Sequence, residues 1–240
     1  GNVIHLGERD CSLQRRYQKI LEEAPVSNLD DGPLQAMRNA AVSLARHIGY
    51  ESAGTVEFVV DADRGEFFFL EMNTRVQVEH PVTEMITGVD IVAEQLRIAA
   101  GATLSIRQED VHFSGHAIEC RINAEAPARG FSPSPGRINE WLPPEGPGVR
   151  IDSHAQQGYV VPPFYDSLVA KLIVHGTDRA DAIARTAAAL ERFRVSGIET
   201  TIPFHRHVLK QEDFVSGRVN TTWLEDVAKN FALRSQLREA

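Results

Sequence analysis

The sequence predicts an α+β fold, in which an antiparallel sheet is combined with helices. Three segments alternate apolar and polar side chains as strands do: residues 55–60, 66–81 and 115–125. Apolar spacing and capping residues favour helices in three others: residues 33–48, 90–100 and 178–196. The first two strands are joined by a short turn, which favours antiparallel pairing between them.

The composition narrows the classes of protein to consider. The 240 residues are 42% hydrophobic and 24% charged, which suits a soluble globular protein of one large or two small domains. A net charge of −8 argues against a nucleic-acid partner. No apolar run approaches the roughly 18 residues of a membrane span, and the N-terminal residues lack a signal-peptide core, so a cytoplasmic protein is expected. Cys11 and Cys120 show no metal-binding spacing and are expected to be reduced.

The N-terminal third contains one clear helix. Gly1 to Leu6 is expected to form a short strand. Residues 8–19 are rich in charged and amide side chains and follow neither period, which by itself is typical of a solvated loop. Pro33 suits the first turn of the following helix, and Gly49 suits its end. Its apolar stripe comprises Leu34, Met37, Ala41, Leu44, Ala45 and Ile48.

Further elements follow along the chain. Asp90 is expected to cap a helix that runs through about Ala100 and is stopped by Gly101, with four residues in the core: Ile91, Leu96, Ile98 and Ala99. In the strand 115–125, one face is expected to meet the core: Ile118, Cys120 and Ile122. Its other face carries Glu119, Arg121 and Asn123. Arg121 has an alternative interpretation, in which it belongs to a structural Arg–Glu pair on a surface strand.

The C-terminal part begins with short strands. Residues 137–175 are punctuated by Pro and Gly, as such strands are. A helix is expected from Asp178, its N-cap, to Ser196, with Gly197 as its stop. A strand and then a helix are expected over residues 198–227.

The first hairpin brings two carboxylates together. If its loop comprises residues 63–65, with Gly65 left-handed, Glu57 lies directly opposite Glu71. Directly opposed side chains lie about 5 Å apart, so these carboxylates repel unless a cation lies between them. Asn73 adds a third oxygen on the same face. Such a set suits a hard cation such as Mg²⁺, whose other ligands are water and nucleotide phosphates. The alternative is a hairpin whose carboxylates simply face water.

A row of polar residues extends this face. If the extended conformation persists beyond the hairpin, five polar side chains share one side of the strand: Glu71, Asn73, Arg75, Gln77 and Glu79. The opposite side stays apolar.

These residues also carry a family resemblance. The segment LEMNTRVQVEHPVTE, residues 70–84, closely resembles biotin carboxylase, an ATP-grasp ligase. Its Glu-Met-Asn core is shared with other ATP-grasp enzymes, whereas Arg-x-Gln-x-Glu-His-Pro is typical of biotin-dependent carboxylases. The resemblance runs from Gly1 to about Trp223 and covers the C-terminal half of the family pattern.

The resemblance implies an order of domains. The C-terminal part of the ATP-grasp domain is expected at residues 1–104, and the biotin carboxylase C-terminal domain at residues 112–227. Residues 228–240 are expected to be a polar tail. No glycine-rich phosphate loop occurs in the sequence, so this chain alone is expected not to turn over ATP.

The resemblance also implies roles for individual residues. Metal ligands for Mg²⁺, or Mn²⁺, on the ATP phosphates are Glu57, Glu71 and Asn73. Bicarbonate is bound by Lys19, Arg75, Gln77 and the backbone of Val78. Glu79 is the general base, with simple pairing to Arg75 as its alternative role, and Arg121 stabilises the biotin enolate. Gln14 and Tyr17 face the nucleotide, although many biotin carboxylases have histidine where Tyr17 stands.

The implied reaction carboxylates carrier-bound biotin with ATP and bicarbonate. The implied partners are a biotin carboxyl carrier protein or domain, a carboxyltransferase component and a second copy in a homodimer. Two other functions stay open. A different ATP-grasp ligase joins a carboxylate to an amine, which Lys19 and the Arg75-x-Gln77-x-Glu79 pattern disfavour. The other is a non-catalytic module that folds or dimerises without turnover.

Overall fold

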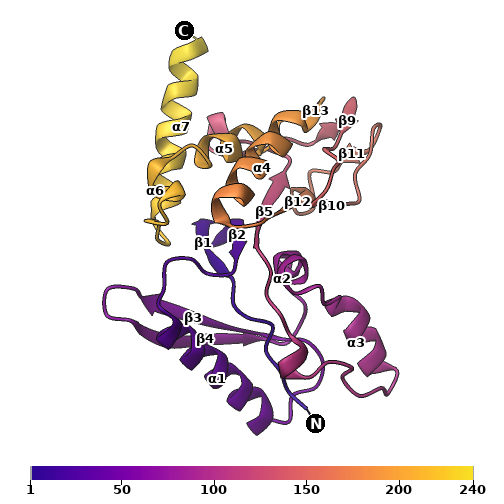
Figure 1. The fold of residues 1–240 in the computed structure, drawn as a ribbon. Helices are drawn as coiled ribbons and strands as arrows, with labels where there is room; N and C mark the ends of the chain where they lie inside the picture. The colour runs from indigo at the N-terminus through magenta and orange to yellow at the C-terminus, as the bar shows by residue number, and fades with distance from the viewer. Residues whose placement is uncertain (1, 240) are drawn as a thin grey trace. The chain divides into compact units, whose positions relative to one another are not determined.

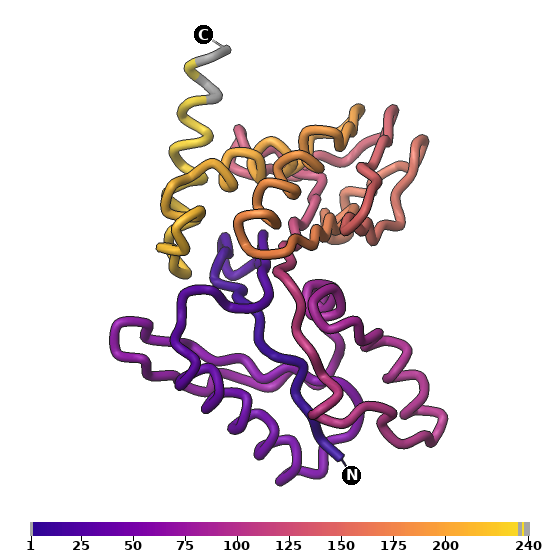
Figure 2. The backbone as a smooth tube through the Cα atoms, viewed as in Figure 1, coloured from indigo at the N-terminus to yellow at the C-terminus, as the bar shows by residue number. Residues whose placement is uncertain are grey.

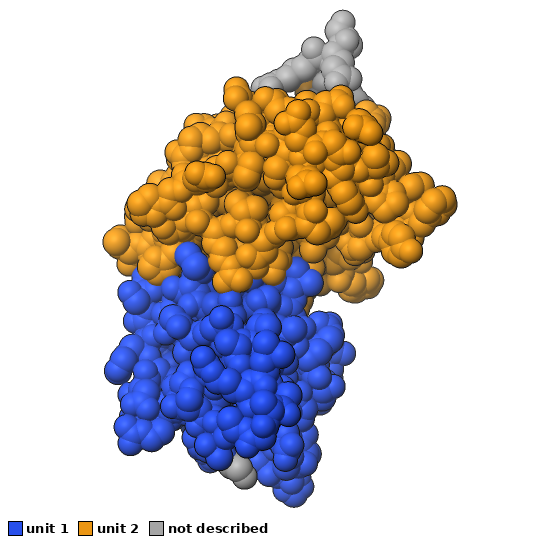
Figure 3. Space-filling view, turned by 90° about the vertical axis from the view of Figure 1, so that its right-hand side faces the viewer, with its two compact units in different colours: residues 1–9, 24–115 blue, residues 10–23, 116–240 orange. Residues whose placement is uncertain are grey.

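The computed structural model describes the backbone of residues 2–239, and their side chains except those of residues 235, 236, 238 and 239. The chain divides into two compact units, which Figure 3 colours separately. Unit 1 comprises Gly1–Arg9 and Ala24–Gly115, and unit 2 comprises Asp10–Glu23 and His116–Ala240. The segment 10–23 therefore joins the C-terminal unit, although 92 residues separate the two parts of unit 2 in the sequence.

Unit 1 is built on a β-hairpin. β3 (Thr55–Asp61) pairs antiparallel with β4 (Glu66–Asn73), and α1 (Asp31–His47) runs beside this hairpin (Figures 1 and 2). The remaining elements of the unit are α2 (His80–Thr87), α3 (Ile91–Ala99) and the short 3₁₀ helix η1 (Gln108–Asp110). The predicted hairpin and the predicted helices at 33–48 and 90–100 are thus confirmed.

A side-chain cap fixes the start of α3. Asp90 accepts a hydrogen bond from the backbone N–H of Ala93 at 2.8 Å, as expected of the N-cap of α3. Leu96, however, is 68% exposed, so its predicted place in the core is wrong. Five residues along a helix turn the side chain through about 140°, which carries Leu96 away from the buried Ile91. Ile48 and Ala99 are exposed as well.

Unit 2 contains a five-stranded sheet. Its strand order is β1 (Asp10–Arg15), β2 (Gln18–Ala24), β5 (His116–Asn123), β12 (Leu168–Gly176) and β10 (Val149–Ser153). α4 (Arg179–Arg192) packs against β12 and β5. The predicted core residues Ile118, Cys120 and Ile122 are confirmed, but the opposite face of β5 is also buried apart from Arg121. β5 is therefore a central strand and not a surface strand.

Shorter elements complete unit 2. The strands are β6 (Glu125–Ala126), β7 (Ser132–Pro133), β8 (Gly136–Arg137), β9 (Glu140–Leu142), β11 (Val160–Val161) and β13 (Arg194–Ser196). The helices are η2 (Pro127–Arg129), α5 (Ile202–Val208), α6 (Glu212–Val215) and α7 (Trp223–Glu239). This confirms the run of short strands over residues 137–175.

Three predicted elements differ from the structure. Residues 2–6 form no strand, and residues 10–24 form the β1–β2 hairpin where a solvated loop was one interpretation. The helix that begins after Asp178 ends at Arg192, because residues 194–196 pair with β9 as β13. Residues 198–227 contain helices and no strand, and α7 continues through residues 228–239.

Glu23 is a buried carboxylate of unit 2 with two side-chain partners. Glu23 accepts hydrogen bonds from Arg179 and lies 2.9 Å from the ring of His116. Burial alone raises the pKa of Glu23, but hydrogen bonds from His116 and Arg179 outweigh burial and lower that pKa below its usual value. Burial also raises the pKa of Cys120 well above its usual value, helped by the nearby Glu22, Glu119 and Glu23 carboxylates, so this thiol is an unreactive core residue.

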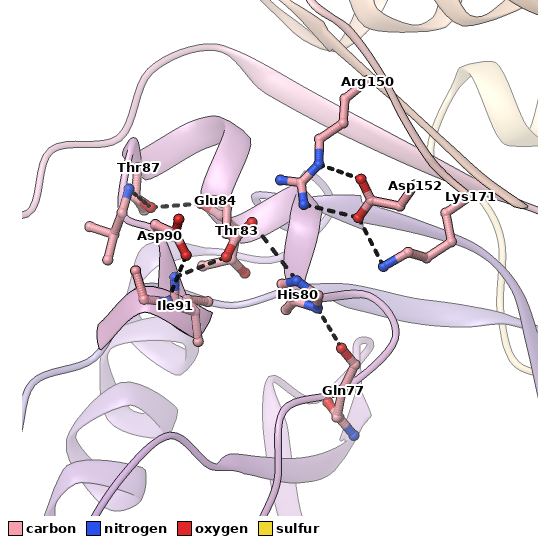
Figure 4. Close-up of polar contacts among 12 residues, drawn as sticks. Gln77, His80, Thr83, Glu84, Thr87, Asp90, Ile91, Arg150, Asp152 and Lys171 are labelled. Atoms are coloured by element: carbon pink, nitrogen blue, oxygen red, sulfur yellow. Dashed lines mark hydrogen bonds and ion pairs between the residues drawn. The ribbon is translucent and has the colours of Figure 1, made fainter. Parts of the chain in front are cut away.

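A cross-strand ion pair also joins β10 to β12. Asp152 accepts from Arg150 at 2.8 and 2.9 Å and lies 3.3 Å from Lys171, its partner in the ladder (Figure 4). Neither Cys11 nor Cys120 forms a disulfide, as expected. Among the described residues, none of the helices combines the length and the hydropathy that a membrane crossing requires.

The burial of His205 predicts that the free energy of unfolding depends on pH. Burial lowers the pKa of His205 to about 4, against a hydrogen bond to the Arg121 carbonyl that raises it. The unfolded chain takes up this proton near pH 6.5, so folding loses stability as the pH falls from 6.5 to 4 and keeps it above 6.5. His205→Gln should remove on the order of 3 kcal/mol of this pH dependence. Urea unfolding at several pH values measures it, and equal slopes in both proteins would contradict the prediction.

Candidate functional site

The predicted opposition of Glu57 and Glu71 is present in the hairpin. The ladder pairs Thr55 with Asn73 and Glu57 with Glu71, but Phe58 pairs with Phe69. Leu70 is therefore an extra residue, a β-bulge that interrupts the ladder beside the two carboxylates. Gly65 has the expected positive φ of 66°, yet the loop comprises four residues, 62–65, because Asp61 pairs with Glu66. The bulge offsets the longer loop, so the expected pairing holds at the site.

Amide groups bring the two carboxylates into one hydrogen-bond network. The Nδ2 of Asn73 donates to Oε1 of Glu57 at 3.2 Å and to Oε1 of Glu71 at 2.9 Å. The Nε2 of Gln77 donates to the same Glu57 oxygen at 2.7 Å. Both carboxylates thus lie on one face of the hairpin and share one donor.

The donor set fits a divalent cation. Glu57, Glu71 and Asn73 supply two carboxylates and an amide, which are ligands that Mg²⁺ accepts. Asn73 now directs its nitrogen at the carboxylates, while its Oδ1 accepts from Nη2 of Arg75 at 3.3 Å. An amide has both groups on one carbon, so half a turn of the Asn73 side chain presents the oxygen instead.

Arg9 stabilises the network through hydrogen bonds from its guanidinium. No pattern in the sequence pointed to this residue. Its guanidinium donates to Oε1 of Gln77 at 2.8 Å and to the hydroxyls of Thr55 and Thr83 at 3.1 and 3.0 Å. Because arginine can only donate, Gln77 must turn its oxygen toward Arg9 and its nitrogen toward Glu57. The sequence signal was a single arginine in a polar run, which points to no particular partner.

The polar row does not continue as one strand. β4 ends at Asn73, residues 74–79 form an irregular connection with a turn at residues 78–79, and α2 begins at His80, with Pro81 in its first turn. The expected shared face through Glu79 is therefore wrong. Arg75 is exposed, whereas Gln77 and Glu79 are buried. Val78 lies in the same turn, half-buried between them.

The start of α2 is held by side chains on both sides (Figure 4). His80 bonds through Nδ1 to the carbonyl of Gln77 at 2.8 Å and lies 3.8 Å from the Glu84 carboxylate. Glu84 also accepts from the backbone N–H of Ile91 at 2.9 Å. The connection that carries Gln77 and Glu79 is thus fixed to both helices that follow it.

Three predicted ligand residues lie on the β1–β2 hairpin of unit 2. Gln14 pairs with Lys19 across the ladder, and Arg15 pairs with Gln18. The two-residue turn between them has positive φ at both Arg16 (49°) and Tyr17 (63°), a conformation that usually takes Asn and Gly. Tyr17 is 98% exposed, so its ring is available to an external partner.

Arg121 is the remaining predicted residue. It lies on β5, its side chain is 17% exposed, and its guanidinium pairs with the buried Glu22 on β2. The structural Arg–Glu pair considered as an alternative is therefore present. The sequence did not single out Glu22, which lies among apolar residues of β2.

Comparisons with known proteins match both parts of the chain. Residues 1–107 match the ATP-binding domain of the carbamoyl-phosphate synthase L chain, and residues 119–226 match the biotin carboxylase C-terminal domain. The chain thus carries the second part of an ATP-grasp domain followed by a biotin carboxylase C-terminal domain. This confirms the predicted fold class.

Individual relatives agree with these matches. Biotin carboxylase 1 of Bacillus subtilis is 58% identical over 225 residues, which cover 94% of this chain and 50% of that protein. The biotin carboxylase of Pseudomonas aeruginosa is 55% identical over 225 residues, which cover 94% of this chain and 49% of that protein.

A solved structure agrees as well. The biotin carboxylase domain dimer of Hydrogenobacter thermophilus 2-oxoglutarate carboxylase, in complex with MgADP, ADP and bicarbonate, has a TM-score of 0.92 and 51% identity. The match covers 96% of this chain and 51% of that chain. The chain belongs to the biotin carboxylase family. It spans about half the length of the curated relatives it matches.

The shared network predicts joint binding of one divalent ion. Glu71→Gln should weaken Mn²⁺ binding to the 240-residue protein by about tenfold or more, because it removes one of two carboxylates from the site. Titration followed by the electron paramagnetic resonance of free Mn²⁺ measures this. Glu66→Gln is the matched control, since Glu66 also opposes an acidic residue, Asp61, in the same hairpin. Equal weakening by both substitutions would show diffuse attraction to acidic residues and no shared site.

Proposed function

We propose that this chain supplies part of the active site of an ATP-dependent biotin carboxylase. The proposed reaction converts ATP, bicarbonate and carrier-bound biotin into ADP, phosphate and N-carboxybiotin. The observation that carries the proposal is the network of Glu57, Glu71, Asn73 and Gln77 on the ATP-grasp hairpin. The complex of the Hydrogenobacter relative with MgADP and bicarbonate supports the same ligands.

Glu57, Glu71 and Asn73 are the proposed ligands of Mg²⁺, or Mn²⁺, on the nucleotide. The ion would neutralise negative charge on the ATP phosphates. Gln14 and Tyr17 are proposed to contact the nucleotide from the β1–β2 hairpin. The exposure of Tyr17 supports this role, because its ring and hydroxyl face solvent in the turn.

Bicarbonate is proposed to bind Arg75, Gln77, the Val78 backbone and Lys19. Arginine and lysine supply positive charge, and the Arg75 guanidinium can grip two oxygens of a planar anion. The Gln77 amide uses one N–H on Glu57 and carries a second N–H for the anion. Arg9 fixes which way this amide points, so the donor is set before the anion arrives.

Glu79 is the proposed base, and Arg121 the proposed partner of biotin. A carboxylate within reach of bicarbonate accepts its proton, which makes the remaining oxyanion a better nucleophile toward the γ-phosphate. Arg121 would stabilise negative charge on the ureido oxygen of biotin. A carrier protein or domain, a carboxyltransferase component, a homodimer and a cytoplasmic location complete the proposal.

A direct assay tests this function. A full-length biotin carboxylase that contains this segment should release ADP only when bicarbonate and biotin are both present. ADP release that depends on an amine and a carboxylate acceptor, and not on bicarbonate, would instead identify a carboxylate–amine ligase.

The Glu79→Gln substitution distinguishes two roles of Glu79: a general base, or a residue that only orients Arg75. In the same full-length enzyme it should lower kcat by on the order of 10²–10⁴-fold, because glutamine keeps the size of the side chain but cannot accept a proton. The KM for bicarbonate should change less than kcat. Steady-state kinetics at varied bicarbonate concentration measure both constants.

The control for this prediction is Glu84→Gln, since Glu84 lies in the same region and binds Ile91 and His80. It should alter stability more than turnover. If Glu79→Gln keeps most of its kcat and loses only bicarbonate affinity, Glu79 orients Arg75 and the base lies elsewhere.

A further inference from the structure

The backbone of Arg121 is anchored by α5. Its carbonyl accepts hydrogen bonds from the hydroxyl of Thr201 at 2.8 Å and from Nε2 of His205 at 2.8 Å. Both donors are fully buried. The ladder between β5 and β12 is irregular here, with a register shift between the partners of Asn123 and Ile122. The backbone at Arg121 is therefore held both by the ladder to Lys171 and by the side chains of Thr201 and His205.

The guanidinium of Arg121 is held at its other end by Glu22. One carboxylate oxygen of Glu22 lies 2.6 Å from Nε and 2.6 Å from Nη2. The Glu22 side chain is fully buried, whereas that of Arg121 reaches the surface of unit 2. An oxygen in the notch between Nε and Nη2 lies on the side of the guanidinium away from Nη1. The contact therefore fixes the plane of the guanidinium and directs Nη1 away from β2.

We propose that Glu22 is a positioning residue, which orients the guanidinium of Arg121 toward the biotin carbonyl. This inference rests on the proposed role of Arg121. Glu22 does not itself meet a substrate, because it is fully buried. Its carboxylate keeps the long arginine side chain in one rotamer, so the positive charge is in place before biotin binds. A charge that needs no rearrangement stabilises a transition state more than a mobile one.

The neighbouring residue provides an internal comparison. Glu23 is also buried, and it receives Nε and Nη2 of Arg179 at 2.8 and 3.0 Å. Arg179 also donates hydrogen bonds to the carbonyls of Phe214 and Val215. Its guanidinium lies over the ring of Phe214. That pair joins parts of the fold to each other. Glu22 and Glu23 are thus two buried, arginine-paired carboxylates on one strand, with different proposed roles.

The test compares Glu22→Gln with Glu23→Gln in a full-length biotin carboxylase that contains this segment. Glu22→Gln should lower kcat for carboxylation of free biotin by on the order of 10- to 100-fold, because a small displacement of a catalytic group costs about that much. The KM for ATP should stay within about twofold. Glu23→Gln should lower the unfolding temperature at least as much and leave kcat within about threefold.

Two further variants test whether Glu22 acts through the orientation of Arg121. Glu22→Asp keeps the charge but shortens the side chain, so it should also lower kcat if orientation matters. In a background of Arg121→Ala, Glu22→Asp should cost no further activity, because residues that act as one unit are not additive. This double variant remains informative if Glu22→Gln fails to fold.

The outcomes separate this inference from the proposed function. If Arg121→Ala loses biotin-dependent turnover while folded Glu22→Gln and Glu22→Asp keep it, the positioning role is overturned and the Arg121 role stands. If Arg121→Ala keeps turnover, the proposed role of Arg121 fails, and the inference fails with it. Equal loss of kcat in Glu22→Gln and Glu23→Gln would assign both pairs to folding alone.

Discussion

A central strand that is buried on both faces imposes a strict requirement on the charged residues it carries. β5 lies between β2 and β12, and apart from Arg121 all of its side chains are buried. A charge removed from water costs several kcal/mol unless a partner of opposite charge is present. The guanidinium of Arg121 therefore meets the carboxylate of Glu22 on β2, and the ring of His116 lies 2.9 Å from Glu23 of the same strand. The β1–β2 hairpin is required in unit 2 for this reason, although the sequence places it next to unit 1.

In the hairpin of unit 1, the electrostatic interaction to be accommodated is a repulsion between two carboxylates. Glu57 and Glu71 oppose each other, and like charges at directly opposed positions destabilise a sheet. Amide donors of Asn73 and Gln77 reduce this repulsion without cancelling the charge of either carboxylate. Arg9 contacts Gln77 and not the carboxylates in the hydrogen bonds described above. The hairpin thus places two carboxylates on one face, which is an arrangement that suits a divalent cation.

The two sites share one principle of construction. In each, the residue proposed to meet a ligand is held by a residue from a distant part of the sequence. Arg9 holds Gln77 across 68 residues, and Glu22 holds Arg121 across 99. A side chain fixed in this way loses little conformational freedom when a ligand binds. In the proposed function, the orientation of Gln77 and Arg121 therefore depends on Arg9 and Glu22, which are not themselves proposed ligands.

The sequence by itself determined the class of fold, the hairpin with Glu57 opposite Glu71, the caps at Asp90 and Asp178, and the family. These features are local, or are written as short motifs, so periodicity and spacing reveal them. Two other features depend on the tertiary structure. Residues 194–196 pair with β9 and do not extend the helix that the sequence predicts there, and the chain turns after Asn73. The tertiary structure also decided the partners of Arg9 and Glu22, because a polar residue in a sequence does not say which distant group will satisfy it. That choice follows from burial, which is a property of the assembled fold.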